Sequence, residues 1–340
     1  MEKVMMTSSA NTLSVTAQRG AQWMLARLER DGSLQGASGL DDYYKAPIGL
    51  ILTGHAQEAD RLLDFVVNGY LQEDGDLDGR DLSWMESFRV YPHAWLTIAA
   101  MMLGRFEVAH SMLRVLSSYH DESTGGFFAT RQGRDQRQGP QEIMSTGAAA
   151  LACLWAGRLD IARRAGAWFE HIYDAQPDLS GGLYHVWDSD SGLVTKFHQD
   201  HAISYRVDAS QTEQWYFMYG ISAAFLSCLS GATREKKWLE LAQKFLRASG
   251  HCQEDVYRQT KSGKIGWGAA WSYRLSRDPE DRRVAESVGA GLQTLQHEDG
   301  YWRAGVSVYD MQAGKTGEAS LAATAEFVTL LSWMCLDLDG

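Results

Sequence analysis

Two kinds of helical segment alternate along the chain. The first kind is poor in charge and rich in Ala, Gly and Ser, as in residues 94–103, 147–156, 221–230 and 268–275. The second kind is amphipathic, with charged residues on one side, as in residues 60–70, 109–119, 162–173 and 238–248. A helix that is apolar all round is packed on every side, whereas an amphipathic helix turns one face to water. The alternation therefore predicts an inner layer of helices covered by an outer layer.

Short joints link each inner helix to the outer helix that follows it. Residues 52–59, 103–109 and 156–162 each combine an apolar helix end, a Gly and a polar start to the next helix, and residues 230–235 and 276–280 make looser versions. Joints this short connect antiparallel helices. The residues that enter the inner helices recur at intervals of 48 to 71 residues: Lys45, His93, Met144, Trp215, Gly266 and Gly317.

A repeat of this period indicates an array of helix pairs. With a further outer helix at residues 16–28, six pairs can close into a ring. We therefore expect an all-α fold, an (α/α)6 toroid of six inner and six outer helices, and a single domain over residues 1–340 with a disordered tail at 1–12.

The connections from each outer helix to the next inner helix are long. Alternation places all of them on the same rim of the ring. Several begin with Asp-Gly or Gly-Gly followed by apolar residues, at positions 31–34, 74–77, 125–128, 181–184 and 299–302. Such turns favour small β-hairpins. The longest connection is expected to carry strands within residues 182–204.

This architecture resembles that of the α/α-toroid proteins, with turns such as Gln-His-Glu-Asp-Gly-Tyr-Trp at residues 296–302. Those proteins include squalene and terpene cyclases, the prenyltransferase β subunit, and the six-hairpin glycosidases and sugar epimerases. The resemblance covers nearly the whole chain but is architectural. It implies a cavity that opens on the rim of long connections and is lined by the N-terminal ends of the inner helices. A fold so widely reused does not define a reaction.

Six residues at the predicted inner-helix entrances are candidates for acid and base chemistry: Asp42, Tyr44, Lys45, His93, Glu142 and Tyr216. A Tyr beside a Lys can exchange protons, and a buried carboxyl group can act as a general acid or base. Four of them also have a purely structural interpretation. Asp42 caps a helix, Lys45 is solvated, His93 is a hydrogen-bonded core group, and Glu142 complements a helix dipole.

Aromatic and amide side chains at the same level are candidates for substrate contacts. The stretch at residues 214–220 opens a helix that carries almost no charge, and Tyr and Trp offer a flat face with one hydrogen-bonding tip. The alternative is a buried aromatic helix start. The full set is Trp84, Tyr91, Trp95, Trp187, Gln214, Trp215, His251, Trp267 and Trp302.

The sequence carries no strong cofactor signature. His185, His198, Asp200 and His201 lie along the longest connection, but their spacing does not match a metal-binding motif. Nucleotide-binding loops, the acidic motif of class II terpene cyclases and a prenyltransferase zinc set are also missing. We therefore expect an enzyme that needs neither metal nor cofactor.

Composition limits which binding partners and which cellular compartment we expect. A net charge of −11 without clustered Lys and Arg argues against nucleic acid and anionic membranes. The first fifteen residues lack the apolar core of a signal peptide, and the apolar helix that residues 214–220 open is too short to span a bilayer. The four cysteines are widely spaced, which is typical of buried thiols in a reducing compartment. We expect a cytoplasmic monomer or homodimer that binds a small molecule.

Three functional hypotheses remain open. The first is an isomerase, cyclase or lyase that acts on a largely apolar or polycyclic small molecule, for example in secondary metabolism. The second is a six-hairpin type of carbohydrate hydrolase, lyase or epimerase, in which the same tryptophans stack on sugars. The third is a non-catalytic binding toroid.

Overall fold

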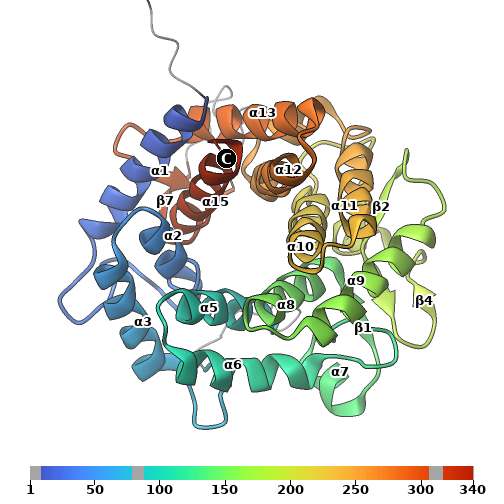
Figure 1. Cartoon of the computed structure of the whole chain (residues 1–340), viewed down its shortest axis with the longest axis horizontal. Coiled ribbons are helices and arrows are strands. Elements are labelled where there is room, and N and C mark those ends of the chain that lie inside the picture. Colours follow the sequence, from blue (N-terminus) through green and yellow to red (C-terminus); the bar gives the residue numbers. More distant parts are fainter. Residues whose placement is uncertain (1–8, 79–87, 306–316, 340) are drawn as a thin grey trace, which may run out of the picture.

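The computed structural model describes residues 9–78, 88–305 and 317–339, and it is a ring of helices (Figure 1). The inner helices are α2 (Ala46–Leu52), α5 (Tyr91–Met102), α8 (Ile143–Trp155), α10 (Phe217–Thr233), α12 (Gly263–Ser276) and α15 (Leu321–Asp339). The outer helices are α1 (Ser9–Leu25), α3 (Ala56–Tyr70), α6 (Phe106–Tyr119), α9 (Leu159–Asp174), α11 (Lys236–Ser249) and α13 (Pro279–Leu295). The predicted all-α toroid is confirmed.

The predicted helix positions agree closely with the structure. Each inner helix begins within four residues of its predicted entry residue. At the N-terminus, α1 begins at Ser9, inside the segment expected to be a disordered tail. Residues 1–8 of that segment lie outside the described residues.

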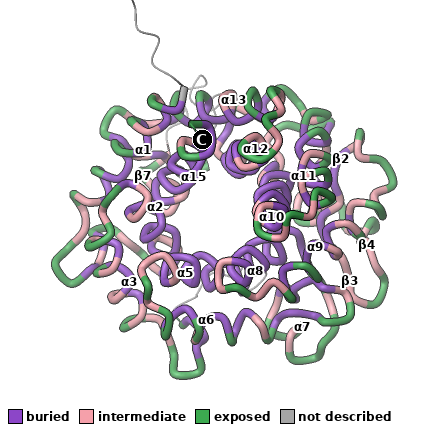
Figure 2. The backbone as a smooth tube through the Cα atoms, in the orientation of Figure 1, coloured by how far each residue is buried: buried purple, intermediate pink, exposed green. Residues whose placement is uncertain are grey.

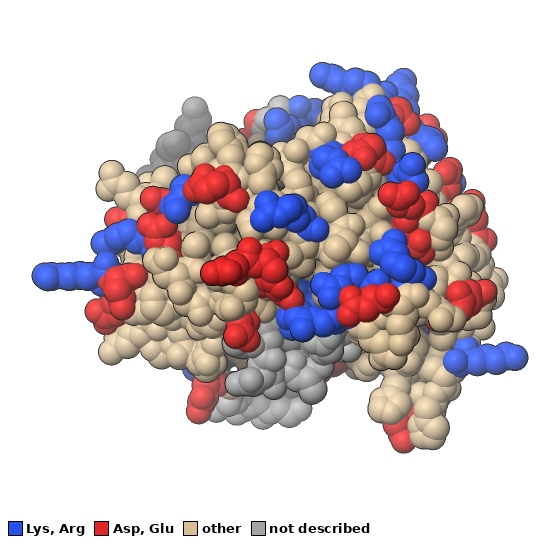
Figure 3. Space-filling view, turned by 90° about the horizontal axis from the view of Figure 1, so that it is seen from below, with Lys and Arg blue, Asp and Glu red and all other residues tan. Residues whose placement is uncertain are grey.

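Burial follows the two sequence patterns. All residues of α8 from Ile143 to Leu154 are buried, and α5 and α10 are nearly as enclosed, because outer helices and neighbouring inner helices surround them (Figure 2). The outer helices bury one face and leave charged side chains exposed. On the face seen in Figure 3, basic and acidic side chains are intermixed.

Four tryptophans fill the axis of the ring. Trp95 comes from α5, which lies across the ring from α12 and α15 in Figure 1, and yet its ring centroid is 5.9 Å from those of both Trp267 and Trp333. Trp267 and Trp333 stack at 4.8 Å, and Trp271 continues the column 5.2 Å from Trp267. The centre of the toroid is therefore a packed aromatic column, which separates the two rims.

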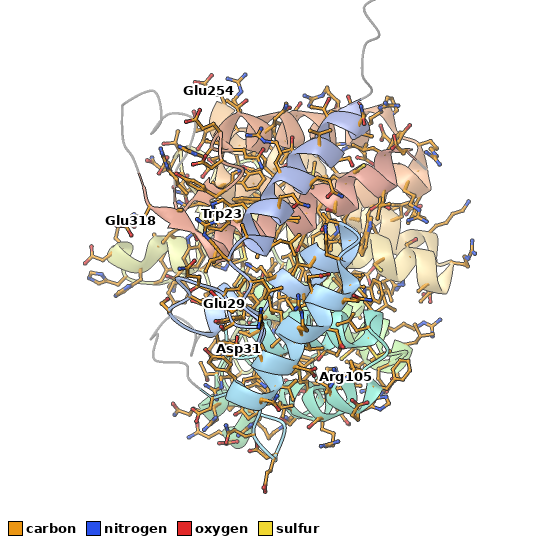
Figure 4. The ribbon with its side chains drawn as sticks, turned by 90° about the vertical axis from the view of Figure 1, so that its left-hand side faces the viewer. Trp23, Glu29, Asp31, Arg105, Glu254 and Glu318 are labelled. Atoms are coloured by element: carbon orange, nitrogen blue, oxygen red, sulfur yellow. The ribbon has the colours of Figure 1, made fainter. Side chains whose placement is uncertain are left out.

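The two rims differ in the length of their connections. Arg105, in the short joint between α5 and α6, lies toward one side in Figure 4, and Glu254 and Glu318, in long connections, lie toward the other. The long connections also carry the strands. These are β1 (Pro140–Glu142), β2 (Gly182–Tyr184), β3 (Val186–Asp188), β4 (Gly192–Leu193), β5 (Arg206–Asp208), β6 (Trp302–Arg303) and β7 (Ala319–Ser320). They pair antiparallel as β1-β3-β4, β2-β5 and β6-β7, which confirms strands within residues 182–204.

A repeated glycine turn joins each of several long connections to the next outer helix. Gly75, after α3, has a φ of +89°, and a Cβ at this position would lie 2.6 Å from the backbone oxygen of Ser111 in α6. The equivalent turn after α13 brings Gly300 against the backbone of Arg19 in α1. The last outer helix thus connects to the first by the same contact, and the ring closes.

Among the described residues, one helix is long and apolar enough to cross a membrane by length and composition. This helix is α15, and 72% of its apolar window is buried inside the structure. It is an inner helix of the toroid, and its burial agrees with a role as a core helix.

The glycine turn provides a test of ring packing. We expect Gly75→Ala to lower the free energy of unfolding by about 1–3 kcal/mol, because a non-glycine residue at this φ is strained and the new Cβ meets the backbone of α6. Gly54→Ala is the matched control, because Gly54 has the same φ of +89° and a Cβ there would meet nothing within 4 Å. Urea unfolding of both variants measures the difference. Equal losses would show that the contact with α6 contributes nothing.

Candidate active site at the inner-helix N-termini

Two buried lysines converge on one carboxylate at the rim of the long connections. Lys45, the residue before α2, places its Nζ 2.5 Å from Oε2 of Glu326 in the first turns of α15. Lys264, in the first turn of α12, donates to the other carboxylate oxygen of Glu326. The lysine side chains are 8% and 5% exposed, whereas Glu326 is 19% exposed and is the member of the cluster nearest to solvent.

Mutual attraction keeps Lys45 and Glu326 ionised. Burial alone would raise the pKa of Glu326, but the charges of Lys264 and Lys45 lower it to about 2. Burial alone would lower the pKa of Lys45, but the Glu326 carboxylate raises it above its ordinary value. Two ammonium groups and one carboxylate give the Lys45–Glu326–Lys264 cluster a net charge of about +1.

Aromatic rings from other inner helices surround the cluster. Nζ of Lys45 lies 5.0 Å from the ring centroid of Tyr44 and 5.3 Å from that of Tyr91 in α5. Nζ of Lys264 lies 5.7 Å from Tyr91 and 5.3 Å from Phe217, at the start of α10. Burial raises the pKa of both tyrosines, so their hydroxyls stay protonated at neutral pH. Five of the six inner helices therefore contribute to one site.

A band of partly exposed aromatic side chains continues from the cluster along the rim. Trp215 stacks on Phe217 with ring centroids 5.7 Å apart, and it also contacts Phe88 and His185 at 6.2 and 6.0 Å. Burial lowers the pKa of His185 to about 4, so this imidazole is neutral. Trp215 and Phe217 are only half-buried, and they offer flat apolar surface beside the charged cluster.

Of the six predicted catalytic residues, the structure brings together Tyr44 and Lys45. His93 is fully buried and belongs to a different cluster, in which its Nε2 lies 3.2 Å from Asp76. Arg89 and Arg131 contact the same carboxylate at 3.0 and 2.6 Å. Burial alone would raise the pKa of Asp76, but hydrogen bonds from His93 and Arg89 lower it well below its usual range. This cluster ties the turn after α3 to α5 and α7 (Arg131–Gln136).

The other three predicted catalytic residues hold local structure. Glu142 caps α8, and its two oxygens accept hydrogen bonds from the backbone N–H groups of Met144 and Ser145. The hydroxyl of Tyr216 donates to Asp255 at 2.7 Å. Asp42 accepts from the backbone N–H of Ser38 at 2.8 Å and closes a turn.

The predicted substrate-contacting residues are distributed over several environments. Tyr91 adjoins the lysines, Trp215 and Gln214 lie on the rim, and Trp187 lies half-buried in β3. Trp95 and Trp267 belong to the buried column. Trp302 is fully buried, with its indole N–H donating to the Leu292 carbonyl at 2.8 Å, and His251 is exposed on the outer side near α11. Trp84 lies outside the described residues.

The histidines of the longest connection do not form a metal cluster in the described parts of the chain. His198 lies 3.3 Å from Asp200, and both are exposed. Within residues 9–78, 88–305 and 317–339, no group of three or more His, Cys, Asp or Glu side chains is arranged to hold an ion.

Sequence reasoning missed the carboxylate at the centre of the site. Glu326 is the only charged residue between Leu321 and Cys335, and Lys264 likewise stands at the start of a nearly uncharged helix. A single charge within an apolar inner helix must be paired to be buried. That signal was available in the sequence and identifies both residues.

The fold defines a protein of the α/α-toroid class, and comparisons with solved structures find other proteins of this fold. It is similar in structure to a D-mannose isomerase, with a TM-score of 0.70, 11% identity and coverage of 99% of both chains. It is also similar to an inactive variant of an α-1,6-mannanase from Salegentibacter sp. HEL1_6 in complex with α-1,6-mannotetrose, with a TM-score of 0.66, 14% identity and coverage of 96% of this chain and 99% of that one.

A possible member of the GH105 family from Salmonella enterica serovar Paratyphi A has a TM-score of 0.61 at 11% identity, with coverage of 99% of this chain and 96% of that one. No family model and no curated sequence matches this chain. At these identities the similarities confirm the toroid fold alone. They agree with the glycosidase-like branch of the expected resemblance, and the terpenoid-cyclase branch has no such support.

The raised pKa of Glu142 predicts how the stability of the protein depends on pH. Burial raises the pKa of Glu142 to about 7, against the opposing hydrogen bonds from Ser145 and Met144. The folded state therefore holds a proton that the unfolded state releases near pH 4.5, and stability falls as pH rises from about 4.5 to about 7. The size of this loss is on the order of 3 kcal/mol, at 1.36 kcal/mol for each pKa unit.

We expect Glu142→Gln to remove this part of the pH dependence. The measurement is the difference in urea midpoint between pH 4.5 and pH 8 for both proteins. Identical pH dependence in the two proteins would contradict the raised pKa.

Proposed function

We propose that this protein is a carbohydrate enzyme that isomerises or epimerises a reducing sugar at the Lys45–Glu326–Lys264 cluster. The observation that carries the proposal is the convergence of two buried ammonium groups on one carboxylate, beside aromatic rings at the inner-helix N-termini. The structural similarity to a D-mannose isomerase supports the choice of substrate class. The carbohydrate hypothesis is thus favoured over cyclisation of an apolar molecule.

The sign of the charge favours one reaction type. Glycoside hydrolysis passes through a positively charged, oxocarbenium-like transition state and uses two carboxyl groups. A cluster with net positive charge destabilises such a state. Isomerisation and epimerisation pass through an enediolate, whose negative charge develops on the oxygens next to the reacting carbon. Lys45 and Lys264 are placed to stabilise that charge by charge-assisted hydrogen bonds.

The same contacts regulate the basicity of Glu326. In the free protein both lysines hold its carboxylate, which lowers its pKa to about 2 and makes it a weak base. When the oxygens of a bound sugar accept hydrogen bonds from the two ammonium groups, Glu326 loses part of this stabilisation and its pKa rises. Substrate binding itself therefore activates the base.

Proton transfer by Glu326 then completes the reaction. Its carboxylate takes the proton from C2 of the open-chain aldose and leaves an enediolate held by Lys45 and Lys264. Return of the proton to C1, with transfer of the O2 hydroxyl proton to O1, gives the ketose, and return to C2 after the enediolate has turned its opposite face to Glu326 gives the epimer. The neutral hydroxyl of Tyr91, whose ring lies beside both lysines, then exchanges a proton with the sugar oxygens.

Trp215 and Phe217 supply the apolar side of the sugar site. Their rings are stacked and half-exposed next to Lys264. Such rings present a face to the C–H groups of a sugar, while the charged cluster meets its oxygens. One flat apolar wall with a few placed polar groups is the usual composition of a small-molecule site.

The direct test is hydrogen exchange at C2. D-mannose incubated with the protein in D2O should gain deuterium at C2 and give ketose or epimer, followed by proton NMR. In parallel, α-1,6-mannotetraose should release no mannose. Release of mannose without exchange on D-mannose would reject isomerisation in favour of the hydrolase hypothesis.

Variants of the cluster locate the chemistry. Glu326→Gln should reduce exchange by about 10²- to 10⁴-fold, the usual contribution of a positioned base. Tyr91→Phe keeps the ring that packs on both lysines and should reduce turnover while leaving the thermal midpoint nearly unchanged. Trp302→Phe, away from the cluster, is the control and should affect stability without changing the rate of the folded enzyme. Unchanged exchange in Glu326→Gln would place the reaction elsewhere.

A further inference from the structure

A pocket lies on the rim of the short joints, among α10, α11 and α12. It has a volume of about 800 Å³, within the range typical of small-molecule sites. Arg234 in the joint after α10, Lys236 at the start of α11 and Leu275 at the end of α12 place it on the side of the short joints. The tryptophan column separates it from the Lys45–Glu326–Lys264 cluster.

The lining of this pocket is mainly apolar and includes an aromatic face. Trp271, the last member of the column, is half-buried and lines the pocket together with Leu239 and Cys228. Leu275 is 44% exposed, which is unusual for a large aliphatic residue on this chain. These side chains suit a flat apolar group that packs against the indole ring of Trp271.

Cationic side chains line the same pocket. They are Arg234, Lys236 and Arg274, against one lining carboxylate, Glu240. Arg274 pairs with Asp337 at 2.9 Å. Arg234 and Lys236 have no ion pair with another described residue, whereas the neighbouring Lys237 pairs with Glu170 at 3.5 Å. On a chain of net charge −11, this is a local excess of positive charge.

A buried hydroxyl also lacks a partner at this pocket. Ser227, one of the lining residues, is fully buried, and its Oγ has no hydrogen bond to any described residue. Buried polar groups without partners are uncommon, because each loses its hydrogen bonds to water. A ligand acceptor or donor that reaches the inner end of the pocket would satisfy it.

From these observations we infer that this pocket binds an aromatic organic anion. The ring system lies on Trp271 and the aliphatic side chains, and the anionic group meets Arg234 and Lys236 at the mouth. The site is distinct from the proposed catalytic site, and its occupation does not depend on the reaction proposed there.

Two fluorescent probes that share an aromatic body test this inference. One is 1-anilinonaphthalene-8-sulfonate, and the other is N-phenyl-1-naphthylamine, which lacks the sulfonate. The wild-type protein should bind the sulfonate at one saturable site and more tightly than the neutral amine. Equal affinities for the two probes would overturn the inference.

Variants then locate the binding. Arg234→Met combined with Lys236→Met should weaken the sulfonate about 3- to 30-fold, the effect of losing two exposed charge pairs, and leave the neutral probe unchanged. Lys237→Met is the matched control, because this lysine adjoins Lys236 in sequence but does not line the pocket. Leu275→Asp, at an exposed position that should not affect folding, should weaken both probes. A loss in Lys237→Met as large as that in the double variant, or no loss in Leu275→Asp, would show that the probes bind elsewhere.

Discussion

The contact of Glu326 with Lys45 and Lys264 joins the last inner helix to the first at the rim of the long connections. Glu326 lies on the last inner helix and Lys45 precedes the first, so their ion pair closes the inner layer. The outer layer closes separately, where Gly300 packs on α1. Burying two ammonium groups is unfavourable unless a carboxylate compensates them, and the loss of one partner from a buried pair is strongly destabilising. The cluster therefore holds the inner helices together and also places net positive charge at the rim.

The tryptophan column explains why the two rims can differ in chemistry. Trp95, Trp267 and Trp333 fill the space that inner helices of this length leave at their centre, so the ring has two separate faces. On one face the first turns of the inner helices meet long connections that carry aromatic residues. On the other face short joints leave a pocket between helix ends. Inner-helix N-termini add positive potential only on the first face, where an enediolate would form.

The architecture could be predicted because it depends on patterns that many residues share. Apolar inner helices, amphipathic outer helices and Gly turns repeat along the chain, and no single position decides the result. The candidate site could be predicted only in part. Tyr44, Lys45 and Tyr91 were found because the repeat identifies the inner-helix entrances. Glu326 was missed because it lies about one turn inside its helix, beyond the entrance positions that the repeat identifies.

Other entrance residues illustrate a different limit. His93 and Tyr216 also stand at inner-helix entrances, but their side chains turn to Asp76 and Asp255 in neighbouring connections. Sequence position places a residue at a level of the ring, and the direction of its side chain depends on partners up to 39 residues away. Glu142 combines both interpretations in one residue. Burial raises its pKa, as a general acid or base would require, and the same side chain caps α8.

The low sequence identity to other toroids is expected, because the residues that determine the fold differ from those that determine the chemistry. An identity of 11% is compatible with a TM-score of 0.70, because small inner residues, glycine turns and amphipathic faces can be met by many sequences. The proposed reaction depends instead on a few side chains at the rim, and above all on the sign of their summed charge. Replacing one lysine of the cluster by a neutral residue would leave a neutral pair, which gives an enediolate less electrostatic stabilisation. Charge at this rim can thus change the reaction while the ring stays the same.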